Sequence, residues 1–273
     1  MNSFSLKVSI VTVSYNCEAT IEQTIQSVLS QDYDNVEYII IDGGSTDGTI
    51  EIIRRYESNI AYWNSEPDRG ISDAFNKGIN CCTGEIVGIL NADDLYLPGT
   101  VSTVVQAFQD NPEAGVVFGD QTFIDLSGKI LYRQVGDPGF IKKIRRGMPS
   151  IPHPTVFVRR LIYDLCGLFD LSYKTAMDYE LLLRFTNMGV KGLYLPVCMA
   201  SMRLGGESEK NYCRGYSEVR DISIRYGLNP VVAYCLYFFR TAKTFFKRVL
   251  ERFGFVQFVK LYRNLFSNRY FYS

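Results

Sequence analysis

Two adjacent carboxylates, Asp93 and Asp94, directly follow a short apolar run at 86–90. An apolar run of this length that ends in polar residues predicts a strand buried between helices. Neighbouring carboxylates at the end of such a strand repel each other unless a hard cation or a proton relieves the repulsion. We therefore interpret Asp93 and Asp94 as ligands of Mg²⁺ or Mn²⁺. The alternative is that they cap a helix beginning in the next few residues.

The chain around this pair alternates between two hydrophobic periods. Apolar runs predict strands at 8–13, 37–41, 60–63, 86–90 and 115–118, and amphipathic spacing predicts helices at 20–30, 49–56, 72–78 and 100–108. This βαβα order predicts an α/β fold with a mostly parallel sheet between helices. In such folds, ligands bind at the carboxyl ends of the strands, where the acidic pair would lie.

A second polar segment, 42–48, follows the strand at 37–41 and contains three glycines. Its glycine spacing does not fit a dinucleotide-binding turn, and no lysine follows as a phosphate-binding P-loop requires. Ile53 stands where an EF-hand would need a bidentate glutamate, so a calcium loop is excluded as well. Asp42 remains as an acceptor for N–H groups of a ligand, and Asp47 as a helix-capping residue.

Four motifs in order carry a family resemblance. They are Val-Thr-Val-Ser-Tyr-Asn at 11–16, Asp-Gly-Gly-Ser-Thr-Asp-Gly at 42–48, Asp-Arg-Gly-Ile-Ser-Asp-Ala-Phe-Asn-Lys-Gly at 68–78 and Asn-Ala-Asp-Asp at 91–94. Over residues 6–205 the chain resembles the family 2 glycosyltransferases, which are inverting, nucleotide-sugar-dependent enzymes. The resemblance implies a GT-A-type fold, a Rossmann-like, mostly parallel sheet sandwiched by helices. We expect this domain to span 1–228, with a helical tail at 229–273.

The same resemblance implies roles for individual residues. The residues expected to bind the donor are Thr12, Ser14, Asn16, Asp42, Asp68, Gly70, Asp73 and Asn91. Asp42 would face the base of the nucleoside. The family's metal-binding D-x-D triplet would be Asn91-Ala92-Asp93, with an amide in the first place. Asp93 would then be the main carboxylate on Mg²⁺ or Mn²⁺, and Asp94 would share that role because Asn91 brings no charge.

Two further residues are expected near the reacting sugar. The resemblance places the general base in an acidic pair at the start of a helix near 178, where only Asp178 is acidic because Met177 replaces the first acid. Glu180 is a weaker rival, and helix capping is the alternative role for Asp178. His153, the only histidine, lies between two prolines. The resemblance implies a place near the donor phosphates or the acceptor, whereas a lone histidine is more often structural.

The rest of the body gives weaker signals. We expect a hairpin over 120–132, a loop-rich stretch at 136–154 with clustered basic residues, and a strand at 193–202. The segment 203–209 contains two glycines and is expected to be a flexible loop, which the family would use as a lid over the substrates.

The tail differs from the body in charge. Residues 229–273 hold eight of the 29 basic residues and one of the 29 acidic residues, so the tail carries +7 and the body −7. Apolar residues recur at helical spacing over 235–253 and again over 255–266, with basic residues between them. This pattern predicts amphipathic helices on an anionic membrane surface. Packing on the body or in a homo-oligomer is the alternative, and the continuous apolar stripe disfavours nucleic acid.

Composition indicates the compartment. The seven cysteines are odd in number and lack metal-ligand spacing, which favours a reducing environment. Neither a signal-peptide pattern nor an uncharged apolar run of roughly 18 residues is present. We expect a cytoplasmic protein, peripheral on the inner face of the plasma membrane.

These observations predict an inverting glycosyltransferase of cell-surface polysaccharide synthesis. It would move a hexosyl or N-acetylhexosaminyl group from a nucleotide sugar, by default a UDP-sugar, to a hydroxyl of a lipid-linked glycan. The alternative is a nucleotide-sugar-binding or scaffold protein that keeps the fold without activity, as Asn91 and Met177 could indicate.

Overall fold

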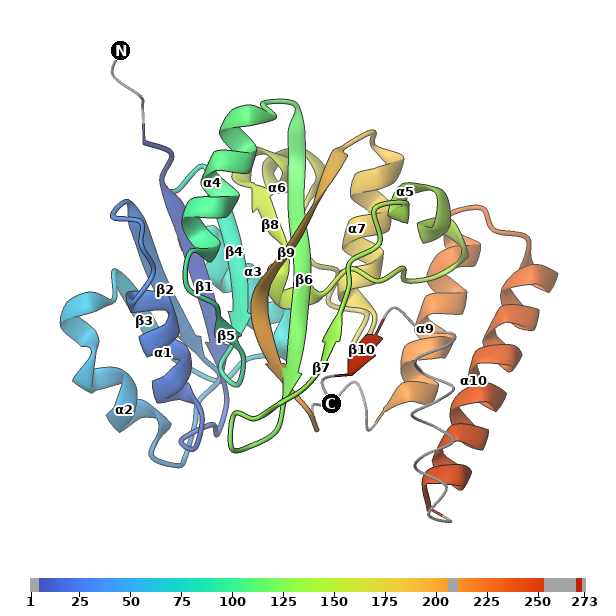
Figure 1. The fold of residues 1–273 in the computed structure, drawn as a ribbon, viewed down its shortest axis with the longest axis horizontal. Helices are drawn as coiled ribbons and strands as arrows, with labels where there is room; N and C mark the ends of the chain where they lie inside the picture. Colours follow the sequence, from blue (N-terminus) through green and yellow to red (C-terminus); the bar gives the residue numbers. More distant parts are fainter. Residues whose placement is uncertain (1–4, 206–210, 253–268, 272–273) are drawn as a thin grey trace.

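A computed structural model describes residues 5–205, 211–252 and 269–271. The strands of these residues form one mixed sheet (Figure 1). Within these residues, the ten strands are β1 Val8–Ser14, β2 Val36–Asp42, β3 Tyr62–Ser65, β4 Ile86–Asn91, β5 Leu95–Tyr96, β6 Ala114–Ile124, β7 Ile130–Gln134, β8 Phe157–Arg159, β9 Lys191–Arg203 and β10 Arg269–Phe271. The main path of the sheet runs β3-β2-β1-β4-β8-β6-β7-β10, and β9 pairs with β6 and β5.

Strand direction and register determine where polar strand ends meet. β3, β2, β1 and β4 are parallel neighbours, whereas β8 runs antiparallel between β4 and β6. The register pairs Asp42 with Ser14 on one side and with Ser65 on the other. Asn91 is paired with Val13, so the polar ends of four strands lie along one edge.

Helices cover both faces of the sheet (Figure 1). The α-helices of the described residues are α1 Ile21–Leu29, α2 Thr49–Arg55, α3 Ile71–Cys81, α4 Thr100–Asp110, α5 Phe140–Lys143, α6 Arg160–Cys166, α7 Met177–Asn187, α9 Tyr212–Arg225 and α10 Pro230–Arg252. Three short 3₁₀ turns are η1 Glu57–Asn59, η2 Ile144–Arg146 and η3 His153–Thr155. α1, α2 and α4 pack on one face, and α3, α6, α7 and α9 on the other.

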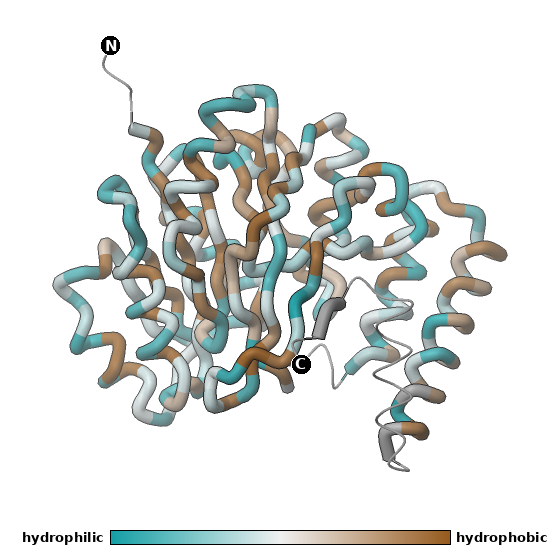
Figure 2. Tube along the Cα trace, viewed as in Figure 1, coloured by the Kyte–Doolittle hydropathy of each residue, from teal (hydrophilic) through white to brown (hydrophobic). Residues whose placement is uncertain are grey.

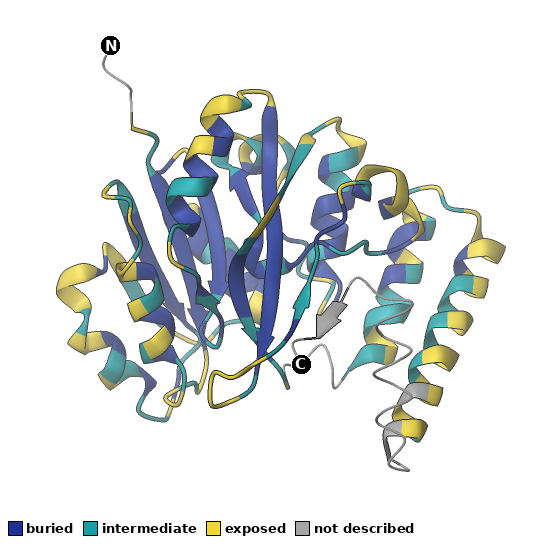
Figure 3. Ribbon diagram, in the orientation of Figure 1, coloured by how far each residue is buried: buried dark blue, intermediate teal, exposed yellow. Residues whose placement is uncertain are grey.

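The two hydrophobic cores follow from the twofold period of the strands. On β1, Val11 and Val13 face α3 and α7, whereas Ile10 faces α1 and α4. Hydrophobic residues accordingly run along the central strands in Figure 2, and Figure 3 shows these strands as buried. The close approach of α3 requires Gly78, because a Cβ there would collide with the side chain of Val11.

The predicted fold class is therefore confirmed, including a helix in the tail. β3 begins two residues later than predicted, and the stretch 136–154 contains α5, η2 and η3 rather than loop alone. Helices α6 and α9 were not predicted. The segment 203–209, predicted as a loop, begins with the last residue of β9, Arg203. Residues 206–210 lie outside the described residues, and so does the apolar pattern predicted at 255–266.

Helix capping does not explain the acidic pair. The residues after Asp94 form β5 rather than a helix, and α4 begins only at Thr100. The capping position of α4 is occupied by Gly99 in the left-handed conformation, and it is Gln31 that accepts a backbone N–H of the first turn, that of Val101 at 3.1 Å. The alternative interpretation of Asp93 and Asp94 as helix caps is therefore wrong.

Candidate active site

The turns after β1 and β2 are joined by side-chain hydrogen bonds. Asn16 adopts a positive φ of 49°, and its backbone N–H donates to the hydroxyl of Ser45 at 2.8 Å. Its side-chain oxygen accepts the backbone N–H of Thr46, also at 2.8 Å. Asn16 thus fixes the glycine-rich turn against the end of β1. The neighbouring Tyr15 is 63% exposed, which leaves its ring available on this surface.

Asp42 is the hydrogen-bond centre of these turns. It is fully buried and accepts bonds from the hydroxyls of Ser14, Ser45 and Ser65 at 2.6–2.8 Å, and from the backbone N–H groups of Gly44 and Ser45 at 3.0 and 2.8 Å. Burial alone would raise the pKa of Asp42, but these bonds outweigh it and lower the pKa. Both carboxylate oxygens are therefore occupied, so Asp42 shapes the turn, and its contact with a base stays a prediction.

Thr12 lies deeper than the edge of the sheet. It is buried, and its hydroxyl accepts a hydrogen bond from the Tyr38 hydroxyl at 3.0 Å. Of the residues predicted on β1, Ser14 is therefore the one at the strand end, although it too is buried and donates to Asp42. The role of both in donor binding stays a prediction.

The segment after β3 closes a third side of this region. The carboxylate of Asp68 lies against Gly43, where a Cβ would come within 2.6 Å of it, and it accepts the N–H of Gly70 at 2.7 Å. Gly70 has a φ of 112°, which favours glycine. Asp73 is buried and pairs with Arg69 at 2.9 Å, which holds its pKa below the usual range. The structure thus brings Asp68 and Gly70 to the glycine-rich turn, whereas Asp73 is engaged with Arg69.

The end of β4 holds the residues predicted to bind metal. Asp94 is buried and accepts the backbone N–H of Arg203 at 3.2 Å and the side-chain amide of Asn91 at 3.5 Å. Burial, with the nearby charge of Asp93, raises the pKa of Asp94 well above its ordinary value. Burial also raises the pKa of Asp93, and the charge of Arg203 opposes this shift. The site therefore disfavours the state in which Asp93 and Asp94 are both ionised.

The donor set at this site fits a divalent cation. The side-chain oxygen of Asn91 is buried and has no hydrogen-bond partner among the described residues. It adds a hard oxygen to the carboxylate of Asp93, and Mg²⁺ typically takes one or two carboxylates and completes its shell with phosphate and water. Within the described parts of the chain, no group of three or more His, Cys, Asp or Glu side chains could hold a metal ion alone. The protein's ligands would therefore need to be completed by a substrate.

Arg203 is a residue of this site that the sequence did not reveal. It is buried at the end of β9, and its guanidinium donates to the carbonyls of Asp125 and Leu126 at 3.3 and 3.2 Å and to the side chain of Gln23. Its only signal in the sequence was its position directly after a predicted strand. Its positive charge lies close enough to the acidic pair to oppose the rise of both pKa values.

His153 and Asp178 meet in a small cavity beneath this edge. The cavity is lined by Ile89, Met148, Ile151, His153, Val156, Tyr163, Phe169, Asp178, Leu181 and Leu182. The His153 ring stacks on Phe75 with ring centroids 5.4 Å apart, and its Nδ1 is buried without a partner in the described structure. Burial raises the pKa of Asp178 and lowers that of His153, and the attraction between the two groups opposes both shifts. The structure therefore places His153 beside the predicted base.

The start of α7 positions Asp178. Glu218 of α9 accepts the backbone N–H groups of Lys174, Thr175 and Ala176 at 2.8–3.2 Å, which fixes the segment leading into the helix. Ala176, rather than Asp178, occupies the capping position of α7.

Glu180 is not available as the alternative base. It is buried, forms an ion pair with Arg184 at 2.8 Å and accepts the hydroxyl of Tyr226 at 2.6 Å. A carboxylate engaged in this way cannot take a proton from a substrate hydroxyl without first breaking these contacts.

One strand joins the two parts of the site. Ile89 lines the cavity of His153 and Asp178, and Asn91 lies two residues further along β4. Alternate residues of a strand point to the same face and lie about 7 Å apart. The cavity of Asp178 is thus next to the edge at which Asn91 and Asp93 lie.

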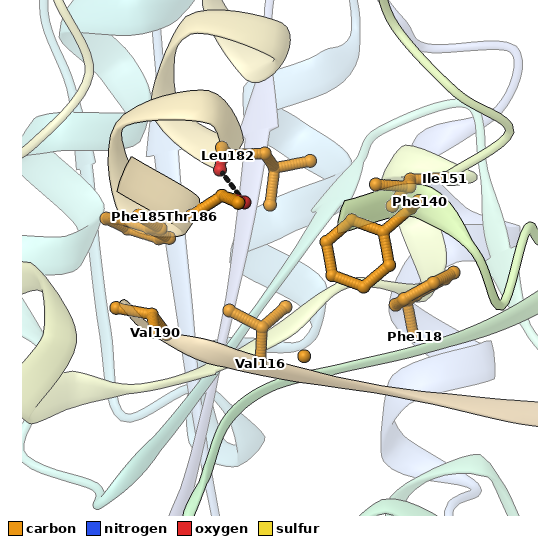
Figure 4. A pocket seen from close by; sticks show the side chains of 9 residues that line it. Val116, Phe118, Phe140, Ile151, Leu182, Phe185, Thr186 and Val190 are labelled. Carbon is orange, nitrogen blue, oxygen red and sulfur yellow. Dashed lines mark hydrogen bonds between the residues drawn. The ribbon is translucent and has the colours of Figure 1, made fainter. Parts of the chain in front are cut away.

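A second cavity lies between β6 and α7 and has a different character. Figure 4 shows it lined by Val116, Phe118, Phe140, Ile151, Leu182, Phe185, Thr186 and Val190. The Thr186 hydroxyl, its polar group, donates to the Leu182 carbonyl at 2.8 Å. This cavity is a gap in the hydrophobic core, and its lining offers nothing to recognise a polar ligand.

Solved structures share this fold. The chain superimposes with a TM-score of 0.65 and 21% identity on the mannosyltransferase PcManGT from Pyrobaculum calidifontis, solved in complex with GDP-Man and Mn²⁺, covering 86% of this chain and 69% of that one. It superimposes with a TM-score of 0.62 and 19% identity on S. aureus TarS 1-349 in complex with UDP-GlcNAc, covering 85% and 70%. The fold is therefore the GT-A type that the sequence predicted.

Sequence comparison gives the family. The model described as Glycosyl transferase family 2 matches residues 9–163. The chain is 32% identical over 184 residues to an uncharacterized glycosyltransferase of Mycobacterium tuberculosis, covering 65% of this chain and 68% of that one. It is 26% identical over 230 residues to a PGL/p-HBAD biosynthesis glycosyltransferase of Mycobacterium bovis, covering 82% and 88%. With its four motifs gathered along one sheet edge, the chain belongs to glycosyl transferase family 2.

Proposed function

We propose that this glycosyltransferase inverts the anomeric centre as it moves a sugar from a nucleotide sugar to a hydroxyl of a lipid-linked glycan. The observation that carries the proposal is the arrangement along β4. Asn91, whose side-chain oxygen has no partner in the described structure, ends the strand two residues before Asp93, and a partly buried carboxylate, Asp178, lines the adjoining cavity. Transfer with inversion needs one group that stabilises the leaving diphosphate and another that deprotonates the acceptor.

The donor would bind over the turns after β1, β2 and β3. Tyr15 presents an exposed ring beside Gly43, and an aromatic face of this kind can stack on a base. Asp68 faces the same turn with its carboxylate and can accept hydrogen bonds from the nucleoside. A UDP-sugar is the first donor to test, since one structural neighbour was solved with UDP-GlcNAc, although the other holds GDP-Man.

The leaving diphosphate develops negative charge next to Asn91 and Asp93. These two residues would hold Mg²⁺ or Mn²⁺, and the ion when bound would act as a Lewis acid on the diphosphate. Asp94 is tied to β9 through the N–H of Arg203, so we assign it to holding the loop while Asp93 faces the substrate. Arg203 adds a fixed positive charge beside both carboxylates.

Asp178 would act as the general base. Its carboxylate must be ionised to accept the proton of the acceptor hydroxyl as the sugar is transferred. A raised pKa makes it a stronger base than an exposed aspartate, at the cost of needing a higher pH to ionise. His153 would stabilise the ionised form by its own positive charge, so we assign it as a positioning residue rather than a donor-binding one.

For the acceptor we propose a glycan on a lipid carrier, used in cell-surface polysaccharide synthesis at the inner face of the plasma membrane. Support comes from the basic aromatic tail, which suits a lipid surface. The name of the PGL/p-HBAD biosynthesis relative points in the same direction.

The test measures binding and turnover separately. Thermal-shift screening of UDP-, GDP- and dTDP-sugars, with and without Mn²⁺, should identify a donor whose stabilising effect requires the metal. Release of the matching nucleoside diphosphate should then depend on an acceptor. Asp93→Asn should abolish the metal-dependent part of the shift, whereas Asp164→Asn on the exposed side of α6 serves as the control. Donor binding without turnover across a broad acceptor panel would contradict catalysis and leave a binding protein.

A further inference from the structure

Helix α10 packs on α9 along one of its sides. Ala233 is buried, and the Tyr216 hydroxyl of α9 lies 2.9 Å from that of Thr244. The guanidinium of Arg220 on α9 lies 4.8 and 5.0 Å from the ring centroids of Tyr234 and Tyr237. These contacts fix which face of α10 points toward the body and which points away from it.

The opposite side of α10 is an exposed aromatic stripe. Its four phenylalanines are exposed by more than half: Phe238 by 64%, Phe239 by 68%, Phe245 by 56% and Phe246 by 65%. Val231 and Leu250 extend the stripe in both directions. Figure 2 shows hydrophobic residues recurring along α10, and Figure 3 shows that its outer side is exposed. A contiguous apolar surface of this kind on one helix indicates an interaction site.

Positive charge borders the stripe. Lys243 and Arg248 are exposed on α10, and the Arg248 guanidinium lies 4.2 Å from the ring centroid of Tyr212. Arg240 donates to the backbone carbonyl of Arg146 at 2.8 Å, so α10 directly contacts the basic segment 142–146. The sequence did not show that these two basic regions meet. Arg240 lies four residues before Thr244, so this contact is on the side of α10 that packs on α9. We call the outer stripe of α10 and its bordering cations, Lys243 and Arg248, the α10 face.

The charges on this surface indicate which kind of partner binds to it. Aromatic side chains bordered by cations match the interface of an anionic bilayer, where rings enter the headgroup region and cations meet lipid phosphates. A twofold dimer through the stripe would place two sets of cations against each other. No helix in the described parts of the chain is long and apolar enough to span a bilayer. The geometry points to contact along the surface.

We propose that the α10 face docks this protein on an anionic lipid bilayer, with α10 lying in the plane of the headgroups. This inference rests on the proposed function, because docking would bring the enzyme to the membrane that carries a lipid-linked acceptor.

The experiment measures co-sedimentation of the full chain with vesicles, in the absence of donor and acceptor. Binding to an equal mixture of phosphatidylcholine and phosphatidylglycerol should be strong, and binding to phosphatidylcholine alone weak. Raising the salt concentration to about 1 M should release most of the protein, since the Debye length falls to about 3 Å. The double variant Phe238→Ser/Phe245→Ser should bind at least about tenfold more weakly. Serine and phenylalanine have similar helix propensities, so α10 should persist.

The matched control is Leu161→Ser/Leu165→Ser. These leucines lie four residues apart on α6 and are 59% and 64% exposed, but they are not part of the α10 face. This variant should bind vesicles like the wild type. Lys243→Glu/Arg248→Glu should reduce binding to the anionic vesicles by more than about tenfold, at about fivefold for each cation. An unchanged affinity in this variant would refute the contribution of the bordering cations to docking.

Other outcomes would overturn the proposal. If Phe238→Ser/Phe245→Ser turned a dimer into a monomer in sedimentation velocity, the occupant would be a second copy of the chain. If the full chain bound neither type of vesicle, the stripe would be covered by some other part of the protein. Nucleoside diphosphate release with a water-soluble acceptor and no vesicles is measured in parallel. Activity without vesicle binding refutes docking alone, and docking without activity refutes the proposed transfer alone.

Discussion

Buried carboxylates lie at opposite ends of the same parallel strands, Glu37 at the amino end and Asp94 at the carboxyl end. At the amino end, Glu37 accepts hydrogen bonds from Lys7 at 2.9 Å, from the Ser9 hydroxyl at 2.5 Å and from the backbone and hydroxyl of Thr83 at 2.8 and 2.7 Å. Burial alone would raise the pKa of Glu37, but these bonds lower it to about 2. This carboxylate is fully satisfied by the protein.

The carboxyl end is built in the opposite way. Burial raises the pKa values of Asp93 and Asp94, and the side-chain oxygen of Asn91, at the end of the same strand, has no partner in the described structure. Asp178, in the adjoining cavity, also has a raised pKa because of burial. Native proteins pair almost all their buried polar groups, so a cluster left incomplete is the part of the structure that a ligand would complete.

This contrast predicts that substitutions at the two ends affect different properties. At the carboxyl end, removal of a carboxylate should reduce turnover and leave folding intact. At the amino end, removal of a carboxylate should reduce stability and leave the chemistry intact.

The largest effect is expected for Asp178→Asn. Loss of a general base typically costs 10²–10⁴ in rate, so nucleoside diphosphate release under saturating substrate should fall by roughly that factor. The thermal midpoint should not fall, because the substitution removes a buried charge. Turnover within a few fold of the wild type would remove the assignment of Asp178 as the base.

Asp93→Asn should reduce turnover by roughly 10²–10³, because stabilisation of the leaving diphosphate is worth several kcal/mol. The free energy of unfolding, measured in urea at pH 8, should stay the same or rise by about 1 kcal/mol, since repulsion with Asp94 is relieved. The contrast between the two ends is lost if this variant unfolds more easily than the wild type.

Glu37→Gln tests the amino end of the parallel strands. It should lower the free energy of unfolding at pH 7 by about 2 to 3 kcal/mol, because a strongly depressed pKa stabilises the folded state. Since the folded pKa lies below the ordinary 4.5, this contribution is present above about pH 4.5 and is lost as the pH falls toward 2. Urea titrations at pH 7 and pH 3 should therefore differ more for the wild type than for the variant, while turnover per folded molecule stays equal.

The smallest effect is expected for His153→Gln. Activity requires ionised Asp178, so turnover should rise with pH through the raised pKa of that residue. His153 opposes this rise by its positive charge, and its removal should move the acidic limb of the pH–rate profile to higher pH. Turnover at the alkaline plateau should change less than about tenfold. An acidic limb that stays at the wild-type pH would mean that His153 acts only through its packing on Phe75.

The sequence predicted what depends on local pattern. The hydrophobic period identified the strand at 86–90, and its abrupt polar end located Asn91 and Asp93 at the carboxyl edge of the sheet. The same reasoning placed Asp178 near the start of its helix. Each of these conclusions uses only residues that are close in the sequence. The regular geometry of strands and helices then determines where those residues lie in the fold.

What the sequence did not reveal depends on contacts between distant segments. Nothing local to Glu37 indicates that Lys7 and Thr83 will meet it, because that requires the register of three strands. Arg203 was treated as part of a loop because its partners are 77 and 78 residues away along the chain. Asp42 was expected to face a ligand, yet surrounding hydroxyls occupy its oxygens. Long-range pairing thus determines which acids remain open to a substrate.

The 14-residue helix α9 contacts both the segment before Asp178 and helix α10. Its carboxylate Glu218 holds three successive amides ahead of Asp178, and its opposite side carries α10. A tilt of α10 would therefore act on α9 and on the hydrogen bonds of Glu218 to the segment before Asp178. If α10 docks on a bilayer and Asp178 is the base, as we propose, Glu218 would link docking to the position of the base.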